Sequence, residues 1–397
     1  MNKKIVISVN TAWNICNFRA GLVKSFVRQG YEVLVLAHDD EYAPRLATLG
    51  CHFKQLPLDQ HGTNASHDLA LLVKYRRIFQ SVRPFAYLGF TIKPNVYGSL
   101  AASSLAIPVI NNIGGLGTTF LHGAMLTRLV KQLYRFSLRR SSRVFFQNRD
   151  DRQLFLDAGI TSESVSELLP GSGVDLRHFL PLPLPMAASA PGGIRFLLIA
   201  RMLKDKGVEE YAAAARIVRR HMPACEFQLL GGIDAENPNA IRVDQIRKWE
   251  AEGLVRYLKR TDDVRPYLEQ ADCVVLPSYR EGVPHSLLEA AASARPIIAT
   301  DVVGCKDIVD DNCNGFLCRV KSAGDLADKM IRMVYLTPEQ RMCMGATGRA
   351  KVVREFDEDI VINKYLAAIR QIEEAASVSG RGGAVVLPQA APNILRE

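Results

Sequence analysis

The sequence lacks the features of a membrane-spanning, zinc-bound or disulfide-stapled protein. No window approaches the roughly 18 unbroken apolar residues that a membrane-spanning helix needs. The eight cysteines include no C-x-x-C pair and no histidine at zinc-ligand spacing. The short apolar run near the N-terminus is followed by polar residues without a cleavage site, so a first β-strand is expected there rather than a signal peptide. A reduced, cytoplasmic setting with free thiols is therefore expected.

Signals for two common kinds of partner are also missing. The loop after the first expected strand has no G-x-G-x-x-G, which argues against a dinucleotide-dependent dehydrogenase, and no zinc finger or RNP-like motif indicates nucleic acid. The net charge of +9 lies in one half of the chain. Residues 1–180 hold 21 lysines and arginines against 12 acidic residues, and residues 181–397 hold 29 against 29. We expect the basic half to face an anionic membrane or phosphorylated substrates.

Short apolar runs alternate with segments of helical spacing along most of the chain. Strands are expected at 4–10, 32–38, 85–90, 108–113 and 143–148, and again at 194–200, 226–232, 255–260, 273–278 and 296–301. Helices are expected at 16–29, 69–82, 95–105 and 121–140, and again at 207–221, 240–252, 263–270, 284–294 and 323–336. Strands separated by helices predict parallel sheets with right-handed crossovers.

The expected fold class is α/β, with two Rossmann-like, doubly wound domains that face each other across a cleft. A chain of 397 residues is too long for one ordinary core. The expected boundaries are residues 1–180 for the first domain, 181–193 for a linker rich in Pro, Ala and Gly, 194–356 for the second domain, 357–376 for a C-terminal helix and 377–397 for a disordered tail. Open α/β sheets bind ligands at such clefts.

Two glutamates flank a loop-to-helix step in "YREGVPHSLLEAAASARPIIATD" (279–301). If a helix begins just after this step, the free N–H groups around Gly282 and Val283 favour a diphosphate. Glu281 precedes that position and Glu289 follows it, about 12 Å apart along a helix, which is comparable to the span from ribose to sugar in a nucleotide-sugar. The stretch predicts that one glutamate binds ribose hydroxyls and the other binds the sugar.

Two cations follow an apolar run in "LLIARMLKDKG" (197–207). Arg201 lies just past the expected strand, and Lys206 precedes a glycine that opens a helix. Arginine offers a fork and lysine a point charge, and both suit a diphosphate leaving group. For each residue alone an ordinary alternative stays open: solvated loop charges for the cations, an N-cap carboxylate for Glu281 and a wet helix face for Glu289.

In combination these motifs resemble the donor domain of retaining nucleotide-sugar glycosyltransferases of family 4, which have the GT-B architecture. Four more stretches are similar to members that extend undecaprenyl-diphosphate-linked sugars in bacteria: "TIKPNVYGSLAA" (91–102), "NNIGGLGTTF" (111–120), "LLPGSGVD" (168–175) and "LLGGIDAENP" (229–238). The resemblance covers about residues 4–372. It implies an acceptor-binding first domain, a nucleotide-sugar-binding second domain and a C-terminal helix that crosses back to the first.

The resemblance also implies an activity. It is the transfer of a sugar, expected to be an N-acetylhexosamine, from a UDP-sugar to an undecaprenyl-diphosphate-linked saccharide in polysaccharide assembly, such as lipopolysaccharide or capsule. Retention favours a front-face route, in which the acceptor hydroxyl enters beside the departing nucleotide and the nucleotide's phosphate takes the proton. Catalysis then depends on positioning and on stabilising charge at the diphosphate. No cofactor and no bound metal are implied.

Carried over by position, the resemblance assigns roles to residues of the second half. The implied catalytic residues are Glu281, Arg201 and Lys206, and the implied nucleotide-sugar contacts are Arg201, Lys206, Glu289 and the backbone of Gly282 and Val283. The two cations would neutralise the diphosphate, Glu289 would hold the ribose, and Glu281 would lie near the donor sugar.

Acceptor-side roles transfer less directly, because "NTAWNICNFRAG" (10–21) stands where many family members have a Gly-Gly loop. The candidate acceptor-binding residues are Arg19, Lys93, Asn95, Gly117 and His122. The first three would hold the lipid diphosphate, and Gly117 belongs to a close-approach loop. For His122, contact with the sugar or the acceptor hydroxyl and a plain core or capping role are both open.

The expected helix at 121–140 has a cationic face formed by Arg128, Lys131, Arg135 and Arg139. This face predicts peripheral contact with the anionic inner face of the cell membrane, although a solvated helix packed on its own sheet would give the same pattern.

Two other functions stay open on the sequence. One is a sugar-nucleotide epimerase of similar architecture, which would need acid and base groups and no lipid acceptor. The other is a non-catalytic scaffold of a polysaccharide assembly complex.

Overall fold

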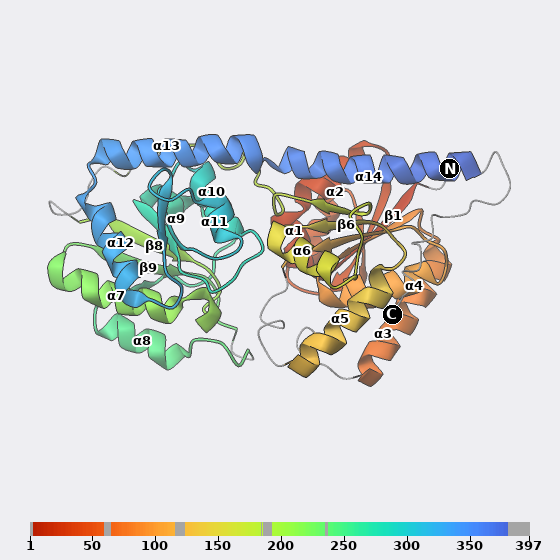
Figure 1. The fold of residues 1–397 in the computed structure, drawn as a ribbon, viewed down its shortest axis with the longest axis horizontal. Helices are drawn as coiled ribbons and strands as arrows, with labels where there is room; N and C mark the ends of the chain where they lie inside the picture. Colours follow the sequence, from red (N-terminus) through yellow and green to blue (C-terminus); the bar gives the residue numbers. More distant parts are fainter. Residues whose placement is uncertain are drawn as a thin grey trace, which may run out of the picture.

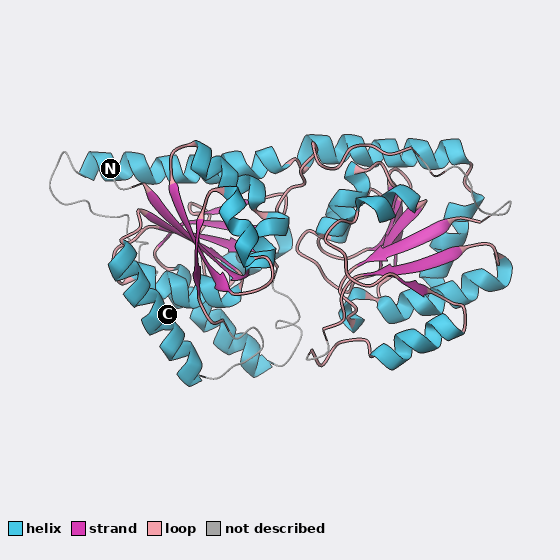
Figure 2. Ribbon diagram, turned by 180° about the vertical axis from the view of Figure 1, so that it is seen from behind, coloured by secondary structure: helices cyan, strands magenta, loops and turns pink. Residues whose placement is uncertain are grey.

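The computed structural model describes residues 3–58, 65–115, 124–183, 185, 193–234 and 237–379. The chain forms two α/β halves that lie side by side, each with a sheet flanked by helices (Figures 1 and 2). The α/β fold class with two doubly wound parallel sheets is confirmed. All eight cysteines are free.

The sheet of the N-terminal half is wholly parallel and has seven strands in the order β3-β2-β1-β4-β5-β6-β7. The strands are β1 (Lys4–Thr11), β2 (Glu32–His38), β3 (His52–Gln55), β4 (Ala86–Phe90), β5 (Val109–Ile113), β6 (Ser141–Phe146) and β7 (Ser166–Leu168). Successive side chains of a strand point to opposite faces, so Ile5 and Ile7 of β1 enter one core and Val6 enters another.

The helices of this half are α1 (Ala12–Phe18), α2 (Ala20–Arg28), α3 (Ala65–Val82), α4 (Ser99–Ser103), α5 (Ala124–Leu138) and α6 (Arg149–Asp157), with a 3₁₀ turn η1 (Ala43–Leu49) and a π turn η2 (Pro94–Gly98). The single helix predicted over 16–29 is in fact two helices. Arg19 separates them, with φ −142° and ψ 10°, outside the helical region.

The sheet of the C-terminal half has six parallel strands in the order β10-β9-β8-β11-β12-β13. The strands are β8 (Arg195–Ile199), β9 (Glu226–Leu230), β10 (Arg256–Tyr257), β11 (Cys273–Leu276), β12 (Ile297–Thr300) and β13 (Gly315–Cys318). The helices are η4 (Lys204–Lys206, 3₁₀), α7 (Val208–His221), α8 (Val243–Ala251), α9 (Arg265–Gln270), α10 (His285–Ala292), α11 (Cys305–Ile308) and α12 (Ala323–Tyr335).

Each sheet reverses its winding direction at one point, between β1 and β4 in the first sheet and between β8 and β11 in the second. The carboxyl ends of the strands beside such a switch point diverge into loops on opposite sides and leave a crevice. The motifs at 197–207 and 279–301 follow β8 and β11, so both leave the second sheet at its switch point.

Two long helices close the chain, α13 (Pro338–Glu355) and α14 (Glu358–Ser379), and run nearly end to end across both halves (Figure 1). Tyr365 and Ile369 of α14 lie in the core that contains β1. The sequence analysis has no helix over 338–355. The tail expected from residue 377 lies largely outside the described residues. No helix in the described part of the chain is long and apolar enough to cross a membrane.

The chain passes between the halves at two neighbouring places. Val174 and Phe179, which follow β7, already pack in a core of the C-terminal half. The amide of Val174 donates to the carbonyl of Phe356 at 2.9 Å, and the amide of Glu358 donates to the carbonyl of Val174 at 3.1 Å. The first crossing thus precedes the linker expected at 181–193, part of which lies outside the described residues.

Candidate active site between the two halves

A cavity of about 1170 Å³ lies between the two halves and is lined by loops from both. Ligand pockets for one small molecule hold roughly 300–1,000 Å³, so this cavity has room for two substrates. Five of the predicted site residues line it: Arg19, Arg201, Lys206, Glu281 and Glu289.

Lys206 and Glu281 meet in this cavity, with Nζ 2.5 Å from Oε1. They follow the adjacent strands β8 and β11, and the amide of Tyr279 donates to the carbonyl of Asp205 at 2.9 Å, which ties the two loops together. Gly207 ends η4 with φ +70°, and a Cβ there would collide with the carbonyl oxygen of Pro277. The glycine therefore allows the close approach that brings the lysine to the glutamate.

Glu289 lines the cavity from the second turn of α10 and contacts His285, with Oε1 2.9 Å from the ring Nδ1. The ring of His285 also lies against that of Phe18 from the N-terminal half, with centroids 4.9 Å apart. Glu289 is therefore held at the cavity wall, with a second carboxylate oxygen to offer to a ligand hydroxyl.

Arg201 follows β8 and is exposed in the cavity, and no hydrogen bond or ion pair engages its guanidinium within the described residues. Lys206, by contrast, has its charge offset by Glu281. An anion that enters this side of the cavity would meet a free guanidinium fork and an ammonium that can exchange partners.

Gly282 and Val283 are not among the residues that line the cavity. They pack against the N-terminal half, where a Cβ on Gly282 would collide with the carbonyl of Gly114 and a Cβ on Gly171 would lie 2.7 Å from Val283. The cavity is lined instead by Pro284, His285 and Ser286. The N-terminal end of α10 thus faces the cavity.

The loop that carries Glu281 is also held by an ion pair across the halves. Arg280 donates from a terminal guanidinium nitrogen to Oδ1 of Asp151, whose side chain is 0% exposed. The other carboxylate oxygen of Asp151 accepts from Nδ2 of Asn148 at 2.9 Å. The sequence analysis missed this pair, because nothing in either local stretch indicates a partner 129 positions away.

Arg19 reaches the cavity from the break between α1 and α2. Its guanidinium lies over the ring of Phe90, 4.2 Å from the centroid, and donates to the side-chain oxygen of Asn14. Burial lowers the pKa of Arg19 to about 10. No carboxylate pairs with it in the part of the chain that the structure describes, so this side of the cavity also favours an anionic or strongly accepting ligand group.

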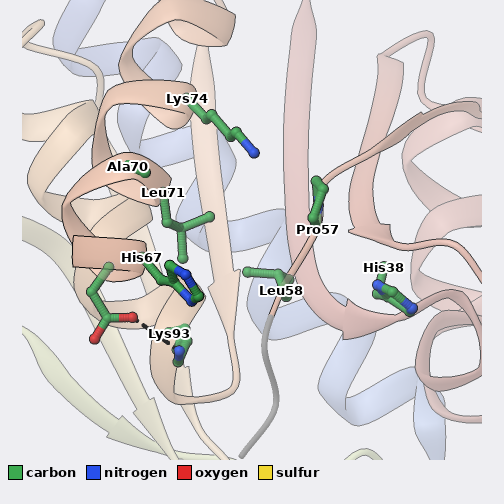
Figure 3. Close-up of a pocket in the computed structure, with 9 residues that line it drawn as sticks. His38, Pro57, Leu58, His67, Ala70, Leu71, Lys74 and Lys93 are labelled. Carbon is green, nitrogen blue, oxygen red and sulfur yellow. Dashed lines mark hydrogen bonds and ion pairs between the residues drawn. The ribbon is translucent and has the colours of Figure 1, made fainter. Parts of the chain in front are cut away.

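Asn95, a candidate acceptor contact, has a side chain that is 1% exposed and hydrogen-bonds within the sheet. Its Nδ2 donates to the carbonyl of Asn112 at 2.8 Å, and its Oδ1 accepts from Nδ2 of Asn111 at 2.9 Å. Lys93 does not line the cavity between the halves; it pairs with Asp68 at 2.9 Å in a separate pocket (Figure 3). Gly117 and His122 lie outside the described residues.

A second set of contacts joins the halves at another part of the cavity wall. Asp262 accepts from Tyr42 and, at 2.7 Å, from Arg45, and these two hydrogen bonds lower the pKa of the Asp262 carboxyl. Arg260 pairs with Glu41 at 2.8 Å. The sequence analysis did not predict these contacts. No group of three or more His, Cys, Asp or Glu that could hold a metal ion occurs within the ranges described above.

Both halves match known families. The family described as glycosyl transferases group 1 matches residues 193–335, and the glycosyl transferase 4-like domain matches residues 18–171. The N,N'-diacetylbacillosaminyl-diphospho-undecaprenol alpha-1,3-N-acetylgalactosaminyltransferase of Campylobacter jejuni is 26% identical over 89% of this chain and 94% of its own length. The UDP-Gal:alpha-D-GlcNAc-diphosphoundecaprenol alpha-1,3-galactosyltransferase of Escherichia coli is 22% identical over 68% of this chain and 74% of its own.

Solved structures share the architecture at low identity. Sucrose-phosphate synthase from Thermosynechococcus elongatus superposes with a TM-score of 0.76 at 17% identity, covering 94% of this chain and 100% of that one. The Anabaena protein HepE in complex with UDP and glucose superposes with a TM-score of 0.73 at 16% identity, covering 95% and 100%. At these identities the likeness extends to the fold alone.

Proposed function

The chain belongs to the group 1 glycosyltransferases, with a 4-like domain in its N-terminal half, and we propose that it moves a sugar from a UDP-sugar to an undecaprenyl-diphosphate-linked saccharide with retention of configuration. The names of the Campylobacter jejuni and Escherichia coli relatives supply the substrate classes. The observation that carries the proposal is the convergence of Arg201, Lys206, Glu281 and Glu289 on one cavity between the halves. N-acetylhexosamine is the proposed donor sugar, after the first of these relatives.

In the proposed donor complex the diphosphate lies between Arg201 and Lys206. Two cations at the carboxyl edge of β8 offset its charge as the bond to the sugar breaks. Glu289 accepts hydrogen bonds from the ribose hydroxyls, and Glu281 faces the sugar. The N–H groups at the start of α10 add positive partial charge on the same side of the cavity.

The proposed chemical step is a front-face displacement. The acceptor hydroxyl oxygen forms a bond to the anomeric carbon while the bond from that carbon to the diphosphate oxygen breaks. The hydroxyl proton passes to the departing phosphate, and UDP leaves. In this route Glu281, which pairs with Lys206 at 2.5 Å, forms no bond to the sugar.

Contact with the inner face of the cell membrane is part of the proposal. On α5, Val130, Tyr134 and Leu138 pack inward, which leaves Arg128 and Arg139 exposed to solvent. Phe136 on the same helix is 64% exposed, and a large exposed ring beside cations is typical of interfacial helices. Sedimentation with vesicles tests this contact: binding should require anionic lipid and weaken with salt, and equal binding to neutral vesicles would contradict it.

The activity is tested by incubating the protein with a panel of UDP-sugars and lipid-diphosphate-linked sugars and analysing the lipid product by mass spectrometry. The proposal expects UDP release that depends on added acceptor and a lipid product heavier by one sugar. Conversion of the UDP-sugar without an acceptor would instead support an epimerase. A donor that stays intact with every lipid would leave the scaffold function standing.

A further inference from the structure

A chain of three aromatic rings crosses the boundary between the halves and ends beside Glu289. The ring of Trp13 meets that of Phe18 edge-on, with centroids 5.0 Å apart, and the ring of Phe18 in turn meets that of His285 at 4.9 Å. Trp13 and Phe18 belong to α1 of the N-terminal half, whereas His285 and Glu289 belong to α10. All four side chains stand at the cavity between the halves. The N-terminal half therefore reaches the histidine that contacts the proposed ribose-binding glutamate.

The rings of the N-terminal half have a fixed position. Helix α1 follows β1 directly, and its first turn is capped by Thr11, whose Oγ1 accepts from the amide of Asn14 at 3.3 Å. The amide of Trp13 donates to Oδ2 of Asp40 at 3.0 Å. The cap and this second hydrogen bond hold the short helix to its neighbours. They thereby hold the ring of Phe18, the last residue of α1, at the cavity wall.

On the other side of the boundary, His285 holds one oxygen of Glu289. Its Nδ1 lies 2.9 Å from Oε1, and since a carboxylate accepts, the ring donates from Nδ1. The two residues are four positions apart, so they share one face of α10. Their side chains are only 18% and 15% exposed, and neither makes another hydrogen bond or ion pair with any residue that the structure describes. Oε2 of Glu289 is therefore the oxygen left for a ligand.

The contact fixes a side chain that would otherwise be mobile. A glutamate has several rotatable bonds, and a ligand that must first order such a side chain binds more weakly. His285 orders Glu289 in advance. The edge contact with Phe18 orders the imidazole in turn, because the contact is lost if either ring rotates away.

We propose that His285 is a positioning residue for the donor, which presents Oε2 of Glu289 to the ribose hydroxyls, and that Phe18 holds His285 in place from the other half. This inference rests on the function proposed above and deepens it. Donor recognition would otherwise belong to the C-terminal half alone. Here the affinity for the UDP-sugar depends on a residue of the half that is expected to bind the acceptor.

Calorimetric titration with two nucleotides tests the positioning without turnover. His285→Ala should weaken UDP about tenfold, because Glu289 loses both a hydrogen bond and its fixed rotamer. Binding of 2′,3′-dideoxyuridine diphosphate should change less than about twofold, since this nucleotide lacks the hydroxyls that Glu289 is proposed to accept from. His285→Asn, whose amide nitrogen can take the place of Nδ1, should keep the UDP affinity within about threefold of wild type. Equal losses for the two nucleotides, or a loss in His285→Asn as large as in His285→Ala, overturn the proposal.

The link to the N-terminal half is tested by a double-mutant cycle. Phe18→Ala should weaken UDP about two- to tenfold, the range expected for a lost aromatic pair. In the His285→Ala background it should cause no further loss, because both side chains act through Glu289, and additive losses overturn the link. Two matched controls, His221→Ala at the exposed end of α7 and Tyr335→Ala, whose side chain is 73% exposed on α12, should stay within about twofold.

Kinetics separates this inference from the function on which it rests. In His285→Ala the KM for the UDP-sugar should rise about tenfold while kcat changes less than about threefold, since the ribose is bound in the same way before and during transfer. A fall in kcat at unchanged KM overturns the positioning role. If UDP binding depends on His285 and on the ribose hydroxyls but no lipid acceptor gains a sugar, the positioning role stands and the proposed function falls. If transfer occurs but both nucleotides lose affinity equally, the function stands and this inference falls.

Discussion

Asp151→Asn is expected to slow sugar transfer although residue 151 touches neither substrate. Asp151 is fully buried, with one oxygen accepting from Asn148 and the other from Arg280 in the loop that carries Glu281. Asparagine keeps the size and removes the charge, and its single oxygen must then serve two donors. One of them loses its partner, and the cation across the halves loses its counter-charge.

The magnitude follows from the burial of the two partners. Removing a hydrogen bond between charged groups costs about 1.5–3 kcal/mol. The side chain of Arg280 is 27% exposed and can recover some hydration, which places the cost near the lower end, at about 1.5–2 kcal/mol. Since each 1.36 kcal/mol is tenfold, undocking of the loop is expected to lower the transfer rate by about 10- to 30-fold.

The assay is UDP release at saturating donor and acceptor, with Asp150→Asn as the matched control. Asp150 is the neighbouring carboxylate, is about half exposed, and approaches Lys306 only to 3.8 Å, so its replacement should change the rate less than twofold. A double-mutant cycle with Arg280→Met should give a coupling of about 1.5–2 kcal/mol. A rate for Asp151→Asn within twofold of wild type, or a coupling near zero, refutes the idea that this pair positions the Glu281 loop.

Three further predictions address the cavity and its walls. Arg201→Ala is expected to lower kcat/KM for the UDP-sugar at least tenfold, since a charge-assisted contact contributes about 1.5–3 kcal/mol; a change of only a few-fold removes Arg201 from the donor site. Gly282→Ala should lower kcat at least tenfold with an unchanged melting curve, because its Cβ would collide with Gly114, whereas Gly324→Ala, with open space around its Cβ, should keep full activity; equal rates in the two variants contradict the docking. Burial is the main cause that raises the pKa of Glu358 above its ordinary 4.5. Between the unfolded and the folded pKa the folded protein therefore binds more protons than the unfolded chain. The free energy of unfolding falls as the pH rises between these two pKa values. Glu358→Gln should therefore raise the melting temperature at pH 7 and leave it unchanged near pH 3. A melting temperature of the variant below that of the wild type at pH 7 would contradict the destabilising role of the Glu358 charge.

The convergence of Arg201, Lys206 and Glu281 on one cavity was predictable because it is local. Arg201 and Lys206 follow one apolar strand, and Glu281 follows another, so the loops of two adjacent parallel strands had to meet at one edge. The expected strand at 32–38 coincides with β2, since a run of buried residues bounded by polar ones is easily recognised. What each of these residues binds stays a prediction.

Helix α13 was missed for a physical reason. Its interior contains Gly345 and Gly348, which usually weaken a helix, but here they allow close packing, because a Cβ on Gly345 would collide with the carbonyl of Ala294. A start signal was present in the sequence. Thr337 and Gln340 form a capping box around Pro338 at the first helical position.

The positions of the expected acceptor-binding residues were less predictable, because the side chains of Lys93 and Asn95 are held by partners far away in the chain. In "TIKPN" both Lys93 and Asn95 were expected to hold the lipid diphosphate, but two asparagines of β5 bind Asn95 into the sheet. Lys93 is drawn to Asp68, 25 positions earlier. A single sequence does not show which of two nearby polar residues has an internal partner and which is free for a ligand.

The two places where the chain passes between the halves are hydrogen-bonded to each other through Val174, Phe356 and Glu358. Because both crossings lie at one place, they tie the halves together there and leave the rest of the boundary to side-chain contacts. Any opening of the cavity would therefore be a rotation of one half against the other about Val174, with each sheet keeping its own shape. Such a rotation would break the contacts across the cavity, including the ion pair of Arg280 with Asp151.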